Sequence, residues 1–378
     1  MSQFGRPTLD RLWMGDYSVG RQVDSHQNAE PLVECTPWYV VVGRLSMALR
    51  RKPQLRNIAS AIIGLILLLA LAGASYQTVA TSVDADRLPE PGRLVDIGGL
   101  RLQLNCTGKG SPTVILESGL GDVLTQWERV QPEIARFSRV CSYDRAGYGG
   151  SDSGPIPRTS AQIAEELHTL LQKAGEKPPY LLVGHSFGGY NVRVFDGRYP
   201  DLVAGIVLVD STQEDQYELL PTAWNAIGTA MLKRYQSQAR WSPVFINLGV
   251  ARLMLRLRGI QGSHLILQAK YLKARASELE VIQISAEQAR AAGNVSEKPL
   301  VVLTAGKNSD PTLRSGLSER DLEAYQRTWV YDLQMRLARL STRGERIIVP
   351  DSGHDIPSER PDAIVNAVRQ LWEATSHP

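Results

Sequence analysis

The sequence has 378 residues, and its 42 lysines and arginines against 39 aspartates and glutamates leave a formal net charge of +3. This length allows one large α/β domain or two small ones, and the near balance of charge gives no indication of nucleic-acid binding. The chain lacks C-x-x-C and H-E-x-x-H patterns, and its six histidines leave few candidates for a catalytic base. We therefore expect one main domain with appendages, no nucleic acid and no bound metal.

The first part of the chain contains one long uncharged segment. Residues 1–57 mix polar residues with glycine and proline without a sustained period, and they are predicted to be a mostly disordered cytoplasmic segment. From Ile58 to Ala74 the sequence is almost wholly apolar, and it stays uncharged to Val83, which just suffices for a helix to span a bilayer core. We predict a transmembrane anchor over 58–80 and a polar linker over 81–92.

Positive charge precedes this segment and negative charge follows it. The basic residues before it are Arg44, Arg50, Arg51, Lys52 and Arg56. Asp84 and Asp86 come after it, so the positive-inside rule predicts a cytoplasmic N-terminus and an extracytoplasmic remainder. A cleaved signal peptide that starts at Met47 rather than Met1 is the alternative, because small residues suited to cleavage occur at 72–74 and 78–80. Both interpretations export the rest of the protein.

Beyond the linker, strands and helices alternate. Strand-like runs occur at 93–97, 100–106, 113–116, 139–143, 180–183, 204–209, 299–304 and 346–349, and helical spacing at 122–137, 160–174, 318–341 and 361–374. Regular alternation predicts an α/β fold, a mostly parallel eight-stranded sheet with helices on both faces. Residues 211–296 interrupt this pattern, because they have helical spacing throughout and no strand-like run.

The most informative stretch is Gly184-His185-Ser186-Phe187-Gly188. It follows the apolar run 180–183 and leads into residues with helical character. A G-x-S-x-G pentapeptide between a strand and a helix is typical of a nucleophile elbow, a strained turn that projects a serine from the carboxyl edge of a sheet. The pentapeptide alone is common, and its glycines could serve an ordinary tight turn. The strand before it and the helix after it favour a nucleophilic Ser186.

Four motifs resemble those of α/β-hydrolase-fold serine hydrolases, and they occur in that family's order. They are Glu117-Ser-Gly-Leu-Gly121 after the third strand, Asp144-Arg-Ala-Gly-Tyr-Gly149 after the fourth, the Ser186 pentapeptide after the fifth and Ser352-Gly-His354 after the eighth. The resemblance covers about residue 93 to 378 and implies an esterase or lipase, with 211–296 as a helical cap inserted after strand six. It departs from common members at Ser118-Gly119, where His-Gly is usual.

A serine hydroxyl needs a neighbouring base that takes its proton as it attacks. His354 is the predicted base, since it lies in a Gly-containing loop just after the last strand, whereas His185 is expected to be structural. The orienting carboxylate has two candidates. Asp310 occupies the loop after strand seven that the family usually uses, and Asp210 ends strand six, which some members use. We favour Asp210 because a strand terminus holds a side chain rigidly.

The resemblance also implies an oxyanion hole and a reaction class. By motif position the two backbone donors are the N–H groups of Leu120 and Phe187. We expect ester hydrolysis through an acyl-enzyme, on a small and apolar acyl substrate, without a metal or organic cofactor. Peptidase, thioesterase and carbon–carbon hydrolase activities would use the same triad. The alternative of another class is a catalytically inactive hydrolase fold that serves as a binding protein.

Cys106 and Cys141 are expected to form a disulfide. In this fold strand two runs antiparallel beside strand four, so the end of the former meets the beginning of the latter, and the two cysteines occupy those places. Export would supply an oxidising compartment. Two buried free thiols are the alternative, and Cys35 is left unpaired. The sequence makes no prediction of oligomeric state.

Overall fold

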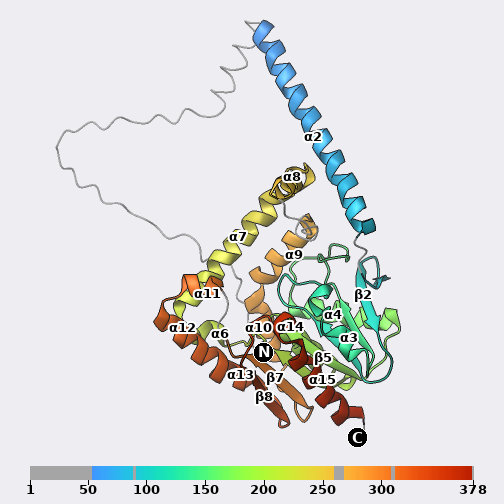
Figure 1. Ribbon diagram of the computed structural model, residues 1–378, viewed down its shortest axis with the longest axis vertical. Coiled ribbons are helices and arrows are strands. Elements are labelled where there is room, and N and C mark those ends of the chain that lie inside the picture. The colour runs from blue at the N-terminus through green and yellow to red at the C-terminus, as the bar shows by residue number, and fades with distance from the viewer. Residues whose placement is uncertain (1–52, 88–90, 259–267, 308–310, 377–378) are drawn as a thin grey trace, which may run out of the picture. The chain divides into compact units, whose positions relative to one another are not determined.

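The structure, a computed structural model, describes residues 53–87, 91–258, 268–307 and 311–376 (Figure 1). Its contacts divide the chain into two compact units, Met1–Leu65 and Ile66–Pro378. The boundary falls within helix α2 (Pro53–Arg87). The expectation of disorder for residues 1–52 lies outside the described residues, as does the alternative triad acid Asp310.

An eight-stranded sheet organises the second unit, in the order β1-β2-β4-β3-β5-β6-β7-β8. Its strands are β1 (Arg93–Asp96), β2 (Arg101–Thr107), β3 (Thr113–Glu117), β4 (Val140–Tyr143), β5 (Tyr180–His185), β6 (Val203–Val209), β7 (Leu300–Ala305) and β8 (Gly344–Val349). Strand β2 pairs antiparallel with β1 and β4, and the remaining pairs are parallel. The expected α/β-hydrolase sheet is therefore confirmed.

Helices cover both faces of this sheet, and neighbouring residues of one strand enter different hydrophobic clusters. Ile115 packs in the cluster that contains residues of α4 (Ser160–Ala174) and α5 (Gly188–Arg198). Val114 and Leu116 pack in the cluster that contains residues of α15 (Pro361–Ser376). A strand buried on both sides reads as a continuous apolar run, which explains why β3, β5 and β7 do not alternate apolar with polar residues.

The helix expected over 122–137 does not form. The structure has instead a 3₁₀ turn, η1 (Leu124–Trp127), and a four-residue helix, α3 (Gln131–Ile134). The Leu124 N–H donates to Asp144 Oδ1 at 2.7 Å. Pro132 stands in the first turn of α3, where its missing N–H is tolerated but where it would interrupt a longer helix. Pro132 thus favours two short elements over the single helix that the spacing predicts.

Two helical segments leave the carboxyl edge of the sheet. Between β6 and β7 come α6 (Gln216–Leu219), α7 (Thr222–Asn247), α8 (Val250–Leu257), α9 (Ala269–Glu280) and α10 (Ile282–Ala291). Between β7 and β8 come α11 (Pro311–Gly316), α12 (Glu319–Gln326), the π-helical η3 (Arg327–Leu333) and α13 (Gln334–Ala338), and α14 (Ile356–Glu359) follows β8. Helix α7 runs for 26 residues, with Pro243 inside it.

Helix α2 is long and apolar enough over Pro53–Val83 to cross a membrane, and it contains the expected anchor 58–80. It begins earlier and ends later than predicted, so that 53–57 and 81–87 are helical rather than disordered segment and linker. After Ala74 neither glycine nor proline occurs before Pro89. Thr78 and Thr81 also bond their hydroxyls back to helix carbonyls, which satisfies these side chains without breaking the helix.

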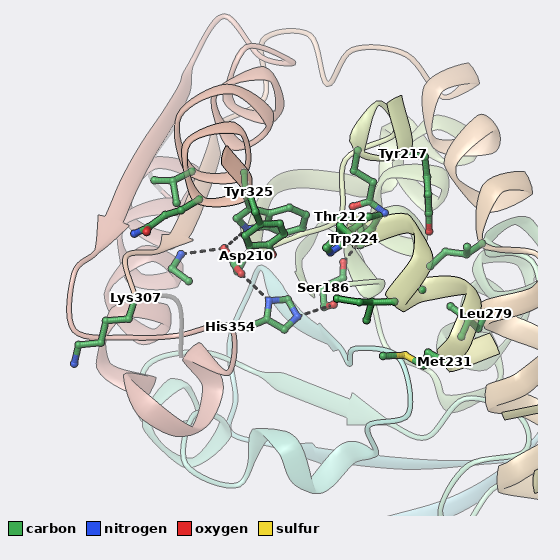
Figure 2. A pocket seen from close by; sticks show the side chains of 18 residues that line it. Ser186, Asp210, Thr212, Tyr217, Trp224, Met231, Leu279, Lys307, Tyr325 and His354 are labelled. Atoms are coloured by element: carbon green, nitrogen blue, oxygen red, sulfur yellow. Dashed lines mark hydrogen bonds and ion pairs between the residues drawn. The ribbon is translucent and has the colours of Figure 1, made fainter. Parts of the chain in front are cut away.

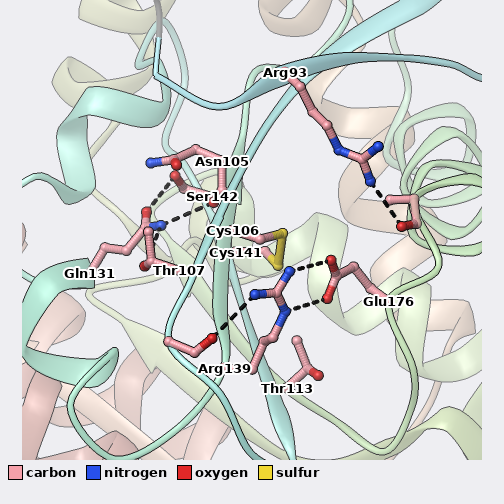
Figure 3. The surroundings of a disulfide bond; sticks show 12 residues. Arg93, Asn105, Cys106, Thr107, Thr113, Gln131, Arg139, Cys141, Ser142 and Glu176 are labelled. Carbon is pink, nitrogen blue, oxygen red and sulfur yellow. Dashed lines mark hydrogen bonds and ion pairs between the residues drawn. A yellow bond between two sulfur atoms is a disulfide. The ribbon is translucent and has the colours of Figure 1, made fainter.

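A disulfide joins Cys106 to Cys141 across β2 and β4, and the two residues stand directly opposite each other in the antiparallel register (Figure 3). Their Cα atoms are 4.1 Å apart. Nearby, the Arg139 guanidinium donates two hydrogen bonds to the Glu176 carboxylate at 2.8 and 2.7 Å, which ties the start of β4 to the loop before β5.

Candidate active site

Ser186 occupies the turn between β5 and α5, with a backbone φ of 51°. Its N–H donates to the Val209 carbonyl at 3.1 Å, and its own carbonyl accepts from the N–H and the hydroxyl of Thr212. A Cβ at Gly184 would lie 2.7 Å from the Gly188 carbonyl oxygen, so the turn closes only without that side chain. These contacts explain why the pentapeptide requires glycine at position 184. They also explain how the sheet holds Ser186 in a left-handed backbone conformation.

The structure brings Ser186, His354 and Asp210 into one hydrogen-bonded series (Figure 2). His354 Nε2 lies 2.9 Å from Ser186 Oγ, and His354 Nδ1 lies 2.6 Å from Asp210 Oδ2. The histidine side chain is 45% exposed, whereas that of the aspartate is 3% exposed. The ring can therefore meet a substrate while its orienting partner stays out of water.

Asp210 is held by groups from two further segments. Its Oδ1 accepts hydrogen bonds from the Ala305 N–H and from Trp329 Nε1, each at 3.0 Å. Hydrogen bonds to a carboxylate stabilise its charged form. Trp329 lies in η3 and was not identified from the sequence. An isolated tryptophan in an amphipathic stretch does not indicate a hydrogen bond to an aspartate 119 residues away.

The loop after β3 is pinned by Arg145. This buried guanidinium donates to the Ser118 carbonyl and to the Gly119 carbonyl, each at 2.7 Å. In a trans peptide the N–H points opposite to the C=O, so fixing the Gly119 carbonyl on Arg145 turns the Leu120 N–H away from it. Among the described residues, no backbone acceptor is paired with the N–H of Leu120 or of Phe187.

Arg145 itself is held by two buried carboxylates. Glu117, on β3, accepts from it at 2.9 Å, and Glu278, on α9, accepts from it at 2.8 and 3.0 Å. Burial raises the pKa of Glu117, which also accepts from Tyr143 and from Asn191. Through Glu278, helix α9 contributes directly to the position of the loop beneath it. A sequence separation of 133 residues between Arg145 and Glu278 gave no indication of this contact.

His185 supports the backbone of His354. The Gln126 amide Nε2 donates to His185 Nδ1 at 3.1 Å, so His185 carries its proton on Nε2 and donates it to the His354 carbonyl at 2.9 Å. Burial, and after it the neighbouring His354, lower the pKa of His185 from 6.5 to about 4. His185 is thus a neutral structural residue beside the elbow.

A pocket of about 290 Å³ opens in front of Ser186 and His354 (Figure 2). Most of its lining is apolar: Trp224, Ile227 and Met231 come from α7, Leu279 from α9, Ile282 from α10, and Tyr325, Trp329 and Val330 from α12 and η3. The segment between β7 and β8 therefore forms part of the pocket together with the helices after β6. The sequence pointed only to the latter as a cap.

The family model of the α/β hydrolase fold matches residues 112–258. A protein of Gibberella zeae described as an AB hydrolase superfamily protein is 26% identical over 283 residues, which are 69% of this chain and 86% of that protein. The chain has the α/β-hydrolase fold. Its fold is similar to that of a thermophilic esterase from Thermogutta terrifontis, with a TM-score of 0.55 and 21% identity over 76% of this chain and 99% of that one.

Other relatives match this chain over shorter stretches. A probable transporter of Hormonema carpetanum is 36% identical over 137 residues, which are 34% of this chain and 20% of that protein. The match to an uncharacterized Bacillus subtilis protein spans 51% of that relative. The shared region thus covers between a fifth and half of these two relatives.

Proposed function

We propose that the protein is a serine hydrolase that cleaves a carboxylic ester through an acyl-enzyme. The proposal rests on the hydrogen-bonded series from Ser186 Oγ through His354 to Asp210, with separations of 2.9 and 2.6 Å. These distances are within the range that proton transfer between a nucleophile and its base requires. A binding protein has no use for such an arrangement in front of an open pocket.

In the proposed reaction, Ser186 Oγ attacks the ester carbonyl carbon while His354 Nε2 takes the hydroxyl proton. His354 Nδ1–H donates to Asp210, which stabilises the imidazolium that forms. The carbonyl oxygen becomes an oxyanion and receives the N–H groups of Leu120 and Phe187. When the intermediate collapses, His354 gives its proton to the departing alkoxide. A water molecule then attacks the acyl-enzyme, with His354 again as the base, and releases the acid and free Ser186.

The pocket favours an apolar acyl group. Aromatic and aliphatic side chains make up most of its wall, and its volume of about 290 Å³ lies at the lower end of the range for ligand pockets, roughly 300 to 1,000 Å³. An ester of a short or medium-length acyl chain fits these properties. An extended peptide is less suited, because aromatic and aliphatic side chains form most of the pocket wall and would face its polar backbone.

We further propose that α2 anchors the protein in a membrane with its N-terminus in the cytoplasm. Large apolar side chains along α2 are exposed, for example Leu67 and Leu71, at 64% and 70%. Such a surface is unfavourable in water and favourable in hydrocarbon. The basic residues before the segment and the acidic residues after it support this orientation.

A fluorophosphonate probe tests the catalytic proposal. Such a probe modifies only an activated serine, so the wild-type protein should be labelled and should hydrolyse p-nitrophenyl esters of apolar acids. Ser186→Ala should abolish labelling and hydrolysis, and His354→Ala should reduce both strongly, because the members of such a triad act as a unit. Folded wild-type protein that neither labels nor hydrolyses any ester in an acyl-chain series would overturn the proposal in favour of a binding role.

A further inference from the structure

We propose that the α7–α8 tip, residues 240–258, is a second membrane-contact surface that lies on the anionic headgroup region of the bilayer crossed by α2. This inference rests on the proposed membrane anchor. It does not depend on the chemistry at Ser186. The occupant is a lipid surface, and the apolar side chains, the charge and the internal contacts of the tip each support that choice.

The tip carries a cluster of exposed apolar side chains. Its members are Trp241, Val244, Phe245, Leu253, Met254 and Leu257, each more than half exposed, with Leu257 at 80%. Elsewhere in the described residues outside α2, exposed large apolar residues occur singly, for example Ile156 and Tyr331. Six exposed apolar side chains within seventeen residues are a concentration of the kind that marks an interaction site.

The charged residues of the tip are all arginines, namely Arg240, Arg252, Arg256 and Arg258. Between Glu218 and Glu278 the sequence has no acidic residue but nine lysines and arginines, in a chain whose net charge is only +3. The Arg240 guanidinium lies 5.2 Å from the centre of the Trp241 ring, and Arg256 and Arg258 flank Leu257. Exposed aromatic and leucine side chains interspersed with arginines are the composition of a helix that lies in an anionic membrane interface.

The opposite face of α8 packs against α2. Buried Arg252 donates to Gln77 Oε1 at 3.0 Å and to Thr81 Oγ1 at 3.3 Å, and all three residues belong to the unit Ile66–Pro378. Gly73 permits this approach, because a Cβ there would lie 2.2 Å from the Leu248 carbonyl oxygen. The two side-chain partners, Gln77 and Thr81, lie at the carboxyl end of the anchor 58–80, where a spanning helix leaves the hydrocarbon. They therefore place α8 at the depth of the headgroups.

A second copy of the chain is a poor occupant of the same surface. Self-association through a two-fold axis would bring one arginine-rich patch against an identical one, and like charges across an interface are unfavourable. An anionic bilayer instead accepts the apolar side chains and neutralises the arginines. Contact with lipid would also join the membrane to the pocket, because the first half of α7 supplies Trp224, Ile227 and Met231 to the lining (Figures 1 and 2).

Depth-dependent fluorescence quenching tests this surface in the full-length protein. In a Cys35→Ser background, a single cysteine is introduced by Leu257→Cys and labelled with an environment-sensitive fluorophore. The protein is reconstituted into vesicles of phosphatidylcholine and phosphatidylglycerol, with or without lipids that carry a spin label below the headgroup. Two matched variants receive the same label: Leu67→Cys, on the exposed face of α2, and Ile156→Cys, a 71% exposed aliphatic residue of a distant loop.

The proposal expects spin-labelled lipid to quench the emission at positions 257 and 67 but not at 156. Quenching at 67 without quenching at 257 would overturn the inference and leave the anchor in place. Absence of quenching at both positions would overturn the anchor together with the inference. Arg256→Glu with Arg258→Glu should reduce the quenching at 257 in anionic vesicles, whereas the reversal of two other exposed arginines, Arg339→Glu with Arg343→Glu, should leave it unchanged. Equal effects of the two pairs would also count against the inference.

Discussion

Backbone strain is concentrated at the candidate site. Among the described residues, three non-glycine residues have a positive φ, and two of them are Ser186 at 51° and Asp210 at 38°. A non-glycine residue in this region costs on the order of 1 kcal/mol or more and persists only where its surroundings hold it. Here the surrounding sheet supplies those contacts, for both residues directly follow buried strands.

Asp210→Asn is expected to lower kcat by about three to four orders of magnitude, because an amide would favour the wrong histidine tautomer. Asp310→Asn serves as the matched control, since it removes the same charge from the other candidate acid. Ester hydrolysis by both purified variants decides between them. A larger loss in the Asp310 variant would transfer the role of triad acid to that residue.

Arg145→Lys should lower kcat by roughly tenfold or more while leaving KM nearly unchanged. Lysine keeps the charge beside Glu117 and Glu278 but lacks the planar fork that binds two carbonyls at once. A misplaced Leu120 N–H would weaken binding of the oxyanion, which exists only in the transition state. Steady-state kinetics with a check of folding by circular dichroism measures this. A rise in KM at constant kcat would indicate a role in substrate binding instead.

His185 should make the protein less stable in mild acid. Folding lowers the pKa of His185 from 6.5 to about 4. Between these two values the imidazole is protonated in the unfolded chain and neutral in the folded chain. The stabilisation is therefore complete above about pH 6.5 and is lost as the pH falls toward 4, by roughly 3 kcal/mol in total. Denaturant unfolding over this range should give a steeper pH dependence for wild type than for His185→Gln. Parallel curves would show that His185 titrates normally.

At the scale of elements, β2 and β4 are an antiparallel pair within a mostly parallel sheet. Strand β2 runs against the direction of the others, and β4 is short, so the pair depends on contacts beyond the backbone ladder. The disulfide, the Arg139–Glu176 ion pair and the hydrogen bond from Ser142 Oγ to Gln131 Oε1 supply them (Figure 3). This matters for the site, because the loop that carries Arg145 begins where β4 ends.

Removing the disulfide should destabilise the hydrolase domain without removing its chemistry. Closing the 35-residue loop between Cys106 and Cys141 limits the conformations of the unfolded chain, and the chain-entropy model assigns this roughly 4 kcal/mol. The double variant Cys106→Ala and Cys141→Ala should therefore have a lower denaturation midpoint and retain probe labelling at Ser186. An unchanged midpoint would mean that the bond contributes no net stability. Cys35→Ser is the control for loss of a thiol elsewhere.

At the scale of the whole molecule, the proposed anchor predicts how the protein fractionates. The full-length chain should stay with membranes after alkaline carbonate washing, because α2 would be held by hydrocarbon rather than by charge. Protease added outside should digest residues after 85 and spare the N-terminal segment. N-terminal sequencing provides the decisive control: a mature protein that begins near Ser75 or Thr81 would identify the segment as a cleaved signal peptide.

The sequence alone predicted the features that depend on local pattern. Binary patterning and the order of four motifs predicted the sheet, because each strand and each glycine-rich turn is specified by its own neighbours in sequence. Ser186 and His354 were named for the same reason. The pairing of Cys106 with Cys141 was also predicted, because it follows from the strand order once the fold is recognised.

Tertiary structure alone decided the contacts that no local pattern encodes. The spacing over 122–137 is helical, yet the chain forms η1 and the short helix α3 there, with Pro132 in the first turn of α3 and the Leu124 N–H bonded to Asp144. The hydrogen bond between Trp329 and Asp210 joins residues 119 positions apart, and that between Glu278 and Arg145 joins residues 133 positions apart. The exposed side chains of the tip come together only after α7 and α8 have folded. Hydrogen bonds of this range depend on where whole elements pack, and packing is a property of the complete chain rather than of any window within it.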